Sequence, residues 1–152
     1  MLREFVETGR YSFKERFDSW EEAIAASCEP LIKEGVVEPV YVEAVINCVK
    51  KYGPYIIIAP NIAMPHSTEG AEGVNETAIC FMKVEEPVHF DANDPEKDAR
   101  LFFVLASVDH EKHLANMMRL SEMLMNEELV EELLEAKSKE DLLAIDAKYQ
   151  EK

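Results

Sequence analysis

Six consecutive apolar residues, Leu101 to Ala106 (LFFVLA), constrain the fold of this chain more than any other feature. The run is far shorter than the roughly 20 residues that a membrane-spanning helix needs. Its aromatic and branched side chains favour a β-strand. Because neither face of the run is polar, we expect a central strand with other elements packed over both of its faces.

Shorter segments in the middle of the chain predict the other strands of the sheet. Tyr55 to Ile58 is a β-branched run that follows a Gly-Pro turn, and such runs are typical of buried strands. The remaining strand candidates are 62–64, 77–84, 88–90 and a weakly alternating stretch before Phe17. Residues 91–98 (DANDPEKD) read as a polar turn before the central strand.

Helical patterns flank this β-rich middle on both sides. Ser19 and Glu22 form a capping box that opens one helix. Pro30 lies inside the pattern, so this helix should kink or break near Glu29. A second helix is predicted from about 39 to 52, where a Gly-Pro pair ends it.

The last third of the chain is also helical, and Ser138 is predicted to cap the final helix. The order of helices, strands and helices favours an α/β (α+β) fold. We expect a single mixed sheet of about five strands flanked by helices on both faces. The length of 152 residues indicates one domain over residues 1–152.

Charge and cysteine content narrow the classes of function. There are 31 Asp and Glu residues against 16 Lys and Arg, a net charge of −15, which argues against nucleic acid and anionic membrane surfaces as partners. The first residues lack a signal-peptide pattern, so a cytoplasmic location is expected. Three cysteines (Cys28, Cys48, Cys80) lie far apart in apolar segments and are predicted to be buried free thiols.

His66 is the first candidate for chemistry. It follows Met64-Pro65 at the end of the short strand candidate at 62–64. Pro65 has a fixed φ and pushes Met64 into an extended conformation, so His66 should be held rigidly at a strand end. A stiffly placed imidazole suits a nucleophile or a ligand. The alternative is a polar residue that merely follows a strand.

His113 is the second candidate, because it lies between the 101–106 strand and the next helix. Strand ends and helix N-termini are where α/β folds bind ligands, and the free N–H groups there attract anions. His113 near His66 would make a two-imidazole anion site. The alternatives are that His113 only starts the helix, or that His110 takes its place. His89 alternates with apolar neighbours and is predicted to face solvent from a strand.

The chain has no familiar metal or nucleotide motif. HExxH, a CxxC pair and a calcium-binding carboxylate loop are missing, as are GxGxxG, GxxxxGK[ST] and the GxSxG of serine hydrolases. We therefore expect neither a metal site nor a bound cofactor.

The IAMPH segment at 62–66 resembles the phosphorylation-site motif of enzyme IIA proteins of the mannitol/fructose type, from the bacterial sugar phosphotransferase system. Further blocks over most of the chain resemble the ascorbate-specific branch of that family. These blocks are VEP at 37–39, YGPY at 52–55, APNIAMPH at 59–66, EGV at 72–74, NDP at 93–95 and VD at 108–109.

The resemblance implies a phosphocarrier with a mixed five-stranded sheet flanked by helices. It implies that His66 accepts a phosphoryl group from phospho-HPr and passes it to a cysteine of a IIB protein or domain. A membrane IIC component then imports the sugar, which the ascorbate-like blocks suggest is ascorbate. His113 aligns with the family's second histidine, which steadies the phosphoryl group. A cationic helper would be Lys50 or Lys51, or would be absent.

Two other interpretations stay open from the sequence. One is a regulatory protein of the same fold that signals through the phosphorylation state of His66 without serving a transporter. The other is a binding protein in which His66 is inert. The oligomeric state is not predicted by any feature of the sequence.

Overall fold

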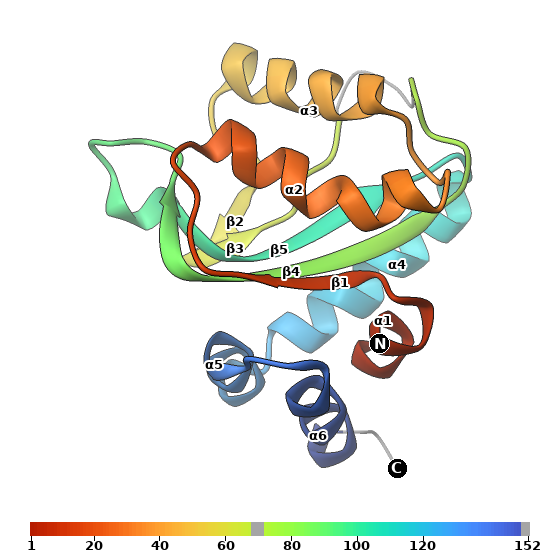
Figure 1. The fold of residues 1–152 in the computed structure, drawn as a ribbon, viewed down its shortest axis with the longest axis vertical. Coiled ribbons are helices and arrows are strands. Elements are labelled where there is room, and N and C mark those ends of the chain that lie inside the picture. The colour runs from red at the N-terminus through yellow and green to blue at the C-terminus, as the bar shows by residue number, and fades with distance from the viewer. Residues whose placement is uncertain (68–71, 150–152) are drawn as a thin grey trace.

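The computed structural model of the protein describes residues 1–67 and 72–149. In that part of the chain five strands form one mixed sheet in the order β1-β4-β5-β3-β2 (Figure 1). The β1–β4 and β3–β5 pairs are parallel, and the β4–β5 and β2–β3 pairs are antiparallel. The strands are β1 (Tyr11–Lys14), β2 (Ile57–Ala59), β3 (Asn61–Ala63), β4 (Ala78–His89) and β5 (Asp98–Ala106).

Helices cover both faces of the sheet. Helices α2 and α3 lie on one face, and α1, α4, α5 and α6 lie on the other (Figure 1). Their bounds are α1 (Leu2–Thr8), α2 (Trp20–Lys33), α3 (Pro39–Tyr52), α4 (His110–Leu124), α5 (Glu127–Glu135) and α6 (Lys139–Tyr149), with a short 3-10 turn η1 (Pro95–Lys97) before β5. The predicted α/β fold with a mixed sheet and helices on both faces is confirmed.

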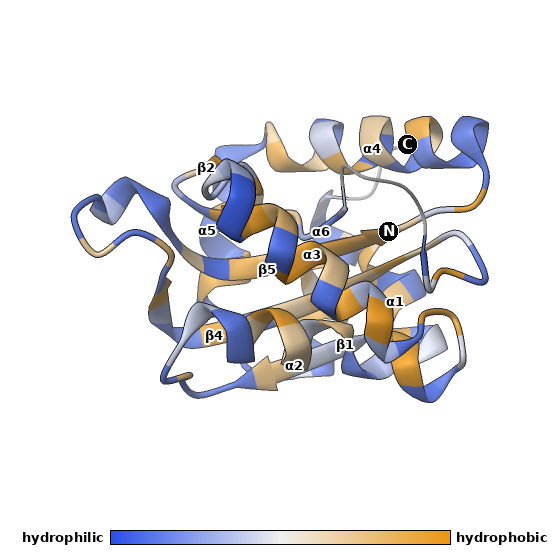
Figure 2. Cartoon of the chain, turned by 90° about the horizontal axis from the view of Figure 1, so that it is seen from above, coloured by the Kyte–Doolittle hydropathy of each residue, from blue (hydrophilic) through white to orange (hydrophobic). Residues whose placement is uncertain are grey.

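Strand β5 is central and buried on both sides, as its sequence predicts. Leu101, Phe103 and Leu105 point into the core under α4 and α5, whereas the alternate residues Phe102 and Val104 point toward α2 and α3. All five side chains are at most 2% exposed. Hydrophilic and hydrophobic residues are interspersed along α3 and α4 (Figure 2). The buried residues of α3 are Tyr41, Val42, Val45, Cys48 and Val49, whereas α4 buries Leu120 and leaves Leu114 and Met118 exposed.

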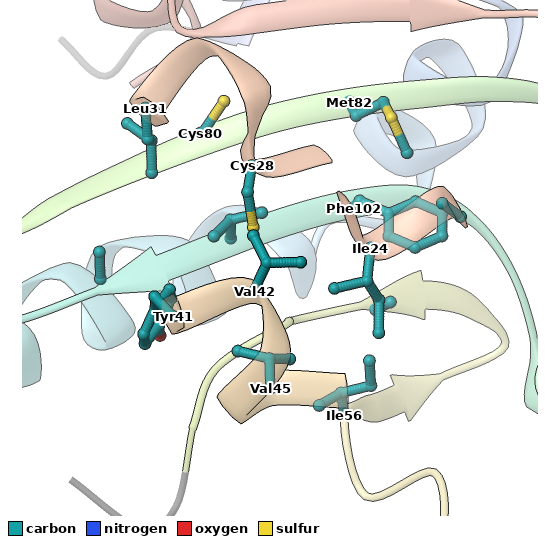
Figure 3. Packing of buried hydrophobic residues seen from close by; sticks show 14 of the residues in the cluster. Ile24, Cys28, Leu31, Tyr41, Val42, Val45, Ile56, Cys80, Met82 and Phe102 are labelled. Carbon is teal, nitrogen blue, oxygen red and sulfur yellow. The ribbon is translucent and has the colours of Figure 1, made fainter. Parts of the chain in front are cut away.

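The core between α2, α3 and the sheet is apolar (Figure 3). Ile24 and Leu31 of α2 pack beside Val45 of α3 over the sheet residues Met82 and Phe102. The same region holds Cys28 and Cys80. The three cysteines of the chain, all within the described residues, are buried, and none of them forms a disulfide. Burial raises the pKa of the Cys28 thiol to about 12. The prediction of buried thiols outside disulfides is confirmed.

Helix α2 continues through Pro30, so the predicted break near Glu29 is wrong. Ser19 caps the helix as predicted, accepting from the Glu22 N–H at 3.2 Å. A proline inside a helix costs about 3 kcal/mol. Ile24, Cys28 and Leu31 are fully buried on either side of it. Burial of this face outweighs the local cost of the proline.

The N-terminal stretch holds a helix that its weak alternation does not predict. Leu2 and Phe5 of α1 are buried, and the Phe5 ring stacks on Phe81 of β4 with centroids 5.9 Å apart. Gly9 then ends α1 with a φ of 74°, a left-handed conformation that glycine adopts easily. The strand expected before Phe17 is β1, which directly follows this turn.

The strands predicted at 77–84 and 88–90 are one continuous strand, β4. A shift in the β4–β5 register between Lys83 and Val88 marks an irregularity where the sequence suggests a gap. Strand β2 begins at Ile57, two residues later than the apolar run indicates. Helix α3 has the predicted bounds, with Pro39 in its first turn.

Strand β4 also carries a fully buried lysine, Lys83, next to the irregularity. Its ammonium group donates to the carboxylate of Glu85. Glu85 also accepts from Lys137 at 3.1 Å and lies 4.0 Å from Arg100. The hydrogen bond from Lys83, followed by that from Lys137, lowers the pKa of Glu85. One carboxylate therefore compensates the buried charge.

Strand β3 is short and ends just before Met64-Pro65-His66. Backbone pairing continues past its end, because the Met64 N–H donates to the Ile56 carbonyl at 2.8 Å and the Leu105 N–H donates to the Pro65 carbonyl at 3.0 Å. His66 is thus the first residue beyond a backbone that is hydrogen-bonded from both sides.

Candidate active site

The imidazole of His66 uses one ring nitrogen to bind the main chain. Nδ1 lies 2.6 Å from the carbonyl oxygen of Met64. A carbonyl oxygen only accepts hydrogen bonds, so Nδ1 carries the proton. In the neutral ring the other nitrogen, Nε2, then keeps its lone pair. This contact makes Nε2 the atom of His66 that can attack an electrophile.

Tyr55 contacts His66 in two ways. Its hydroxyl donates to the main-chain carbonyl of His66. Its ring meets the imidazole edge-on, with ring centroids 5.3 Å apart and an interplanar angle of 89°. Tyr55 reaches this position after Gly53 (φ 83°) and Pro54, where the chain turns from α3 toward the sheet. Sequence reasoning treats Tyr55 as a strand residue and misses this role, although the Gly-Pro turn before it is a signal.

Tyr41, in the first turn of α3, connects the chain beyond His66 to the central strand. Its hydroxyl donates to the Leu105 carbonyl at 2.6 Å and accepts the Ser67 N–H at 3.4 Å. The side chain is 3% exposed, and burial raises the pKa of Tyr41 well above its ordinary value. The phenol therefore stays protonated and remains a donor. Its place on the apolar face of α3 predicts a core residue and gives no sign of this contact.

His113 lies in the first turn of α4, which starts directly after β5. The carboxylate of Asp109 caps this helix by accepting the Lys112 N–H at 3.1 Å. Partial burial lowers the pKa of His113, and the nearby charges of His66 and His110 lower it further. Partial burial and the two neighbouring imidazoles therefore favour the neutral form of His113.

His66 and His113 line the same cleft, which has a volume of about 300 Å³. The other residues that line it come from α3, the segment after β3, the segment before β4, the end of β5 and the start of α4; they are Tyr41, Ser67, Val74, Leu105, Ser107, Val108, Asp109 and His110. The first-turn N–H groups of α4 have no partner within the helix, and they are donors at the N-terminal, positive end of the helix dipole. The cleft thus combines a nucleophilic nitrogen with anion-binding donors.

The other sequence candidates lie as follows. His110 lines the same cleft as His113, as the alternative assignment of the second histidine requires. His89 does not line the cleft; it lies at the end of β4. Its side chain is 68% exposed, as predicted, and pairs with Asp98. Lys50 and Lys51 are in the last turn of α3, and Lys51 lies over the ring of Tyr52. Neither lysine lines the cleft in the described part of the chain.

Among residues 1–67 and 72–149, no cluster of three or more His, Cys, Asp or Glu side chains has the arrangement of a metal site. No helix among them is long and apolar enough to cross a membrane.

The chain matches a known protein family. Residues 4–148 match the family described as "Phosphoenolpyruvate-dependent sugar phosphotransferase system, EIIA 2". The mannitol-specific cryptic phosphotransferase enzyme IIA component of Escherichia coli K12 is 33% identical over 126 residues, which cover 83% of this chain and 84% of the relative.

Two more similarities widen the comparison. The ascorbate-specific EIIA component of Escherichia coli K12 is 31% identical over 129 residues, covering 83% of this chain and 81% of the relative. The complex of mannitol enzyme IIA with phosphorylated mannitol enzyme IIB from Escherichia coli contains a chain with the same fold. That chain superposes with a TM-score of 0.77 at 28% identity, covering 91% of this chain and 94% of the other.

Proposed function

This chain belongs to the EIIA type 2 family of the phosphoenolpyruvate-dependent sugar phosphotransferase system, and we propose that it carries a phosphoryl group on Nε2 of His66. Enzyme IIA components are phosphotransferases, so the chain is a phosphotransferase component. One observation supports the choice of acceptor atom: the 2.6 Å contact between Nδ1 and the Met64 carbonyl engages the protonated nitrogen and leaves the Nε2 lone pair.

In the accepting step, a bond forms between Nε2 of His66 and the phosphorus atom of phospho-HPr. The donor's bond to phosphorus breaks, and its electron pair returns to the donor. In the second step the Nε2–phosphorus bond breaks and its electron pair returns to the His66 ring, while the thiolate of a cysteine of a IIB partner, already deprotonated, bonds to phosphorus. His66 thus ends the cycle as a neutral imidazole, ready for the next transfer.

His113 is proposed to stabilise the moving phosphoryl group. Phosphoryl transfer spreads negative charge over three equatorial oxygens, so catalysis consists mainly of alignment and electrostatic stabilisation. The ring N–H of a neutral His113 is a donor at the cleft, beside the positive N-terminal end of the α4 dipole. The lowered pKa of His113 keeps its ring a hydrogen-bond donor without a permanent positive charge that would hold the phosphoryl group too tightly.

Membership of the family supports a choice of partners and of sugar. A IIB partner is supported by the solved complex of a related enzyme IIA with phosphorylated IIB. We propose HPr as donor, a membrane IIC component as the transporter served through IIB, and a cytoplasmic location. The proposed sugar is ascorbate, supported by the ascorbate-like sequence blocks and by the ascorbate-specific relative. Residues 1–152 are proposed to act as one domain, of which the family match spans 4–148.

A transfer assay with purified components tests this proposal. The protein is incubated with phosphoenolpyruvate, enzyme I and HPr, and its intact mass is measured. A gain of one phosphoryl group is expected, and omitting HPr is the control that must prevent it. An unchanged mass with every component present contradicts the proposal and favours an inert His66.

Separate samples of the phosphorylated protein are then mixed with a IIB protein of the ascorbate type and with one of the mannitol type. Faster loss of the phosphoryl group to the ascorbate-type IIB is expected. Faster loss to the mannitol-type IIB would overturn the choice of sugar and keep the phosphocarrier. Retention of the phosphoryl group with both would favour the regulatory alternative.

A further inference from the structure

We propose that Tyr55 and Tyr41 are positioning residues for His66: Tyr55 fixes the orientation of the imidazole, and Tyr41 fixes the chain on the far side of His66 relative to β5. This inference rests on the proposed function of His66 as phosphoryl acceptor. Both tyrosines lie outside the histidine pair that the sequence identifies, and each acts through His66 or its neighbours.

Tyr55 restricts the two motions that would misplace Nε2. Its hydroxyl holds the main-chain carbonyl of His66, which limits rotation of the peptide that follows the imidazole. The edge of its ring packs against the imidazole, which limits rotation of the side chain. The hydrogen bond from Nδ1 to the Met64 carbonyl exists in one ring orientation only. Tyr55 therefore preserves the tautomer that leaves the lone pair on Nε2.

Tyr41 works through one residue of the central strand, Leu105. The Leu105 N–H donates to the carbonyl of Pro65, the residue before His66. The Leu105 carbonyl accepts from Tyr41, whose hydroxyl also accepts the N–H of Ser67, the residue after His66. Both neighbours of His66 are thus hydrogen-bonded, directly or through one phenol, to the same strand residue.

This arrangement sets the position of His66 relative to His113. Strand β5 ends at Ala106, and α4 begins four residues later, at His110. A tie between the His66 backbone and Leu105 is therefore also a tie to the start of the helix that carries His113. Because a misplacement of about 1 Å can cost about a hundredfold in rate, such ties have kinetic consequences.

The test combines nitrogen-15 NMR of the His66 ring with transfer kinetics. The variants are Tyr55→Phe, which keeps the ring contact, and Tyr55→Leu, which loses both contacts. Tyr41→Phe keeps the buried ring and loses the hydroxyl. The matched control is Tyr11→Phe, which removes a hydroxyl from β1, outside the cleft. The amide spectrum of each variant verifies that it is folded.

The two tyrosines should give different signatures. In the wild type and in Tyr11→Phe, we expect His66 to show a protonated Nδ1 and an unprotonated Nε2. In Tyr55→Leu the two ring nitrogens should move toward averaged shifts, and transfer from phospho-HPr should slow by about tenfold or more. Tyr55→Phe should recover part of both changes. Tyr41→Phe should keep the tautomer and still slow transfer, because it changes the backbone position alone.

Three results would overturn the inference. The first is a wild-type His66 spectrum and rate in both Tyr55 variants. The second is a wild-type transfer rate in Tyr41→Phe, because that result would refute the role proposed for Tyr41. The third is an equal slowing in Tyr11→Phe, since that would show a general effect on the fold. If Tyr55→Leu does not fold, Tyr55→Phe decides by the same two readouts. A wild-type protein that accepts no phosphoryl group refutes the proposed function, whereas the spectra still decide whether Tyr55 sets the tautomer.

Discussion

The histidines at the two ends of the sheet have different hydrogen-bond partners. At one end, where β3 and β5 stop, His66 bonds to a main-chain carbonyl and shares a cleft with His110 and His113. At the other end, His89 on β4 pairs through Nδ1 with the carboxylate of Asp98 at 2.8 Å. Within the described residues, neither His66 nor His113 forms a side-chain ion pair with a carboxylate.

The two ends of the sheet also differ in their ion pairs. Toward the His89 end, β4 carries the buried Lys83, whose charge Glu85 compensates together with those of Arg100 and Lys137. In a chain with a net charge of −15, carboxylates are abundant, so an imidazole without one is informative. A paired carboxylate favours the charged, non-nucleophilic imidazolium. His89 therefore has a carboxylate partner, whereas Asp109, a carboxylate that lines the cleft, caps α4 and does not pair with an imidazole. Among the described residues, the cleft imidazoles thus lack the carboxylate partner that would favour their charged form.

The largest expected effect comes from removing the nucleophile at the cleft end. His66→Ala should abolish phosphoryl acceptance, because it removes the imidazole whose Nδ1 is bound to the Met64 carbonyl and whose Nε2 is the proposed acceptor. The fold should persist, since the imidazole lies at a strand end rather than in the core. Intact mass after incubation with phospho-HPr and a circular dichroism spectrum measure the two results. His89→Ala is the matched control at the other end, and a phosphorylated His66→Ala protein would contradict the assignment.

The second effect concerns stability at the other end. Glu85→Gln leaves the fully buried Lys83 without its carboxylate, and a buried donor that loses its partner in this way costs about 1–3 kcal/mol. We expect a loss of that size in the free energy of unfolding, measured by urea denaturation. Lys83→Met removes the buried charge itself and should be close to neutral. Equal stability of the wild type and Glu85→Gln would mean that the buried charge does not depend on this carboxylate.

The third effect separates the two histidines of α4. His113→Ala should slow transfer from phospho-HPr by about a hundredfold, as expected for one preorganised donor. His113→Gln should recover part of the rate, because an amide can still donate a hydrogen bond. His110→Ala is the control and should stay near the wild-type rate. A quenched time course measures all three, and a slow His110→Ala beside a normal His113→Ala would show that the roles are reversed.

The smallest effect is expected at the exposed pair of the far end. Asp98→Asn removes the partner of His89, whose side chain is 68% exposed, and exposed pairs contribute at most about 1 kcal/mol. The free energy of unfolding should change by no more than that, and the phosphoryl-transfer rate should not change. A slower transfer in Asp98→Asn would break the comparison, because it would couple the two ends of the sheet.

Much of the fold could be predicted because its signals are local. The apolar run at 101–106 indicates a strand covered on both faces, and Pro39 and Gly53 mark both ends of α3. The Met64-Pro65-His66 sequence indicates a rigid imidazole at a strand end. The two histidines that sequence reasoning selects do line one cleft. Their chemical roles remain predictions for the variants above.

The parts that sequence reasoning missed depend on contacts between distant segments. Helix α2 survives Pro30 because burial against the sheet outweighs a local cost. Helix α1 is too short to show a periodicity, and Phe5 finds its stacking partner at Phe81. Tyr41 is 64 residues away from its acceptor, Leu105. Spacing along the chain carries no record of such pairs.

The central claim is that the cleft presents Nε2 of His66 as the acceptor, and one measurement tests it directly. Protein labelled with nitrogen-15 in histidine is phosphorylated by phosphoenolpyruvate, enzyme I and HPr, and the phosphorus–nitrogen coupling of the product is recorded. The account predicts one phosphohistidine, at His66, with phosphorus bonded to Nε2 and a proton kept on Nδ1. Phosphorus bonded to Nδ1 of His66, or to any other histidine, would contradict it.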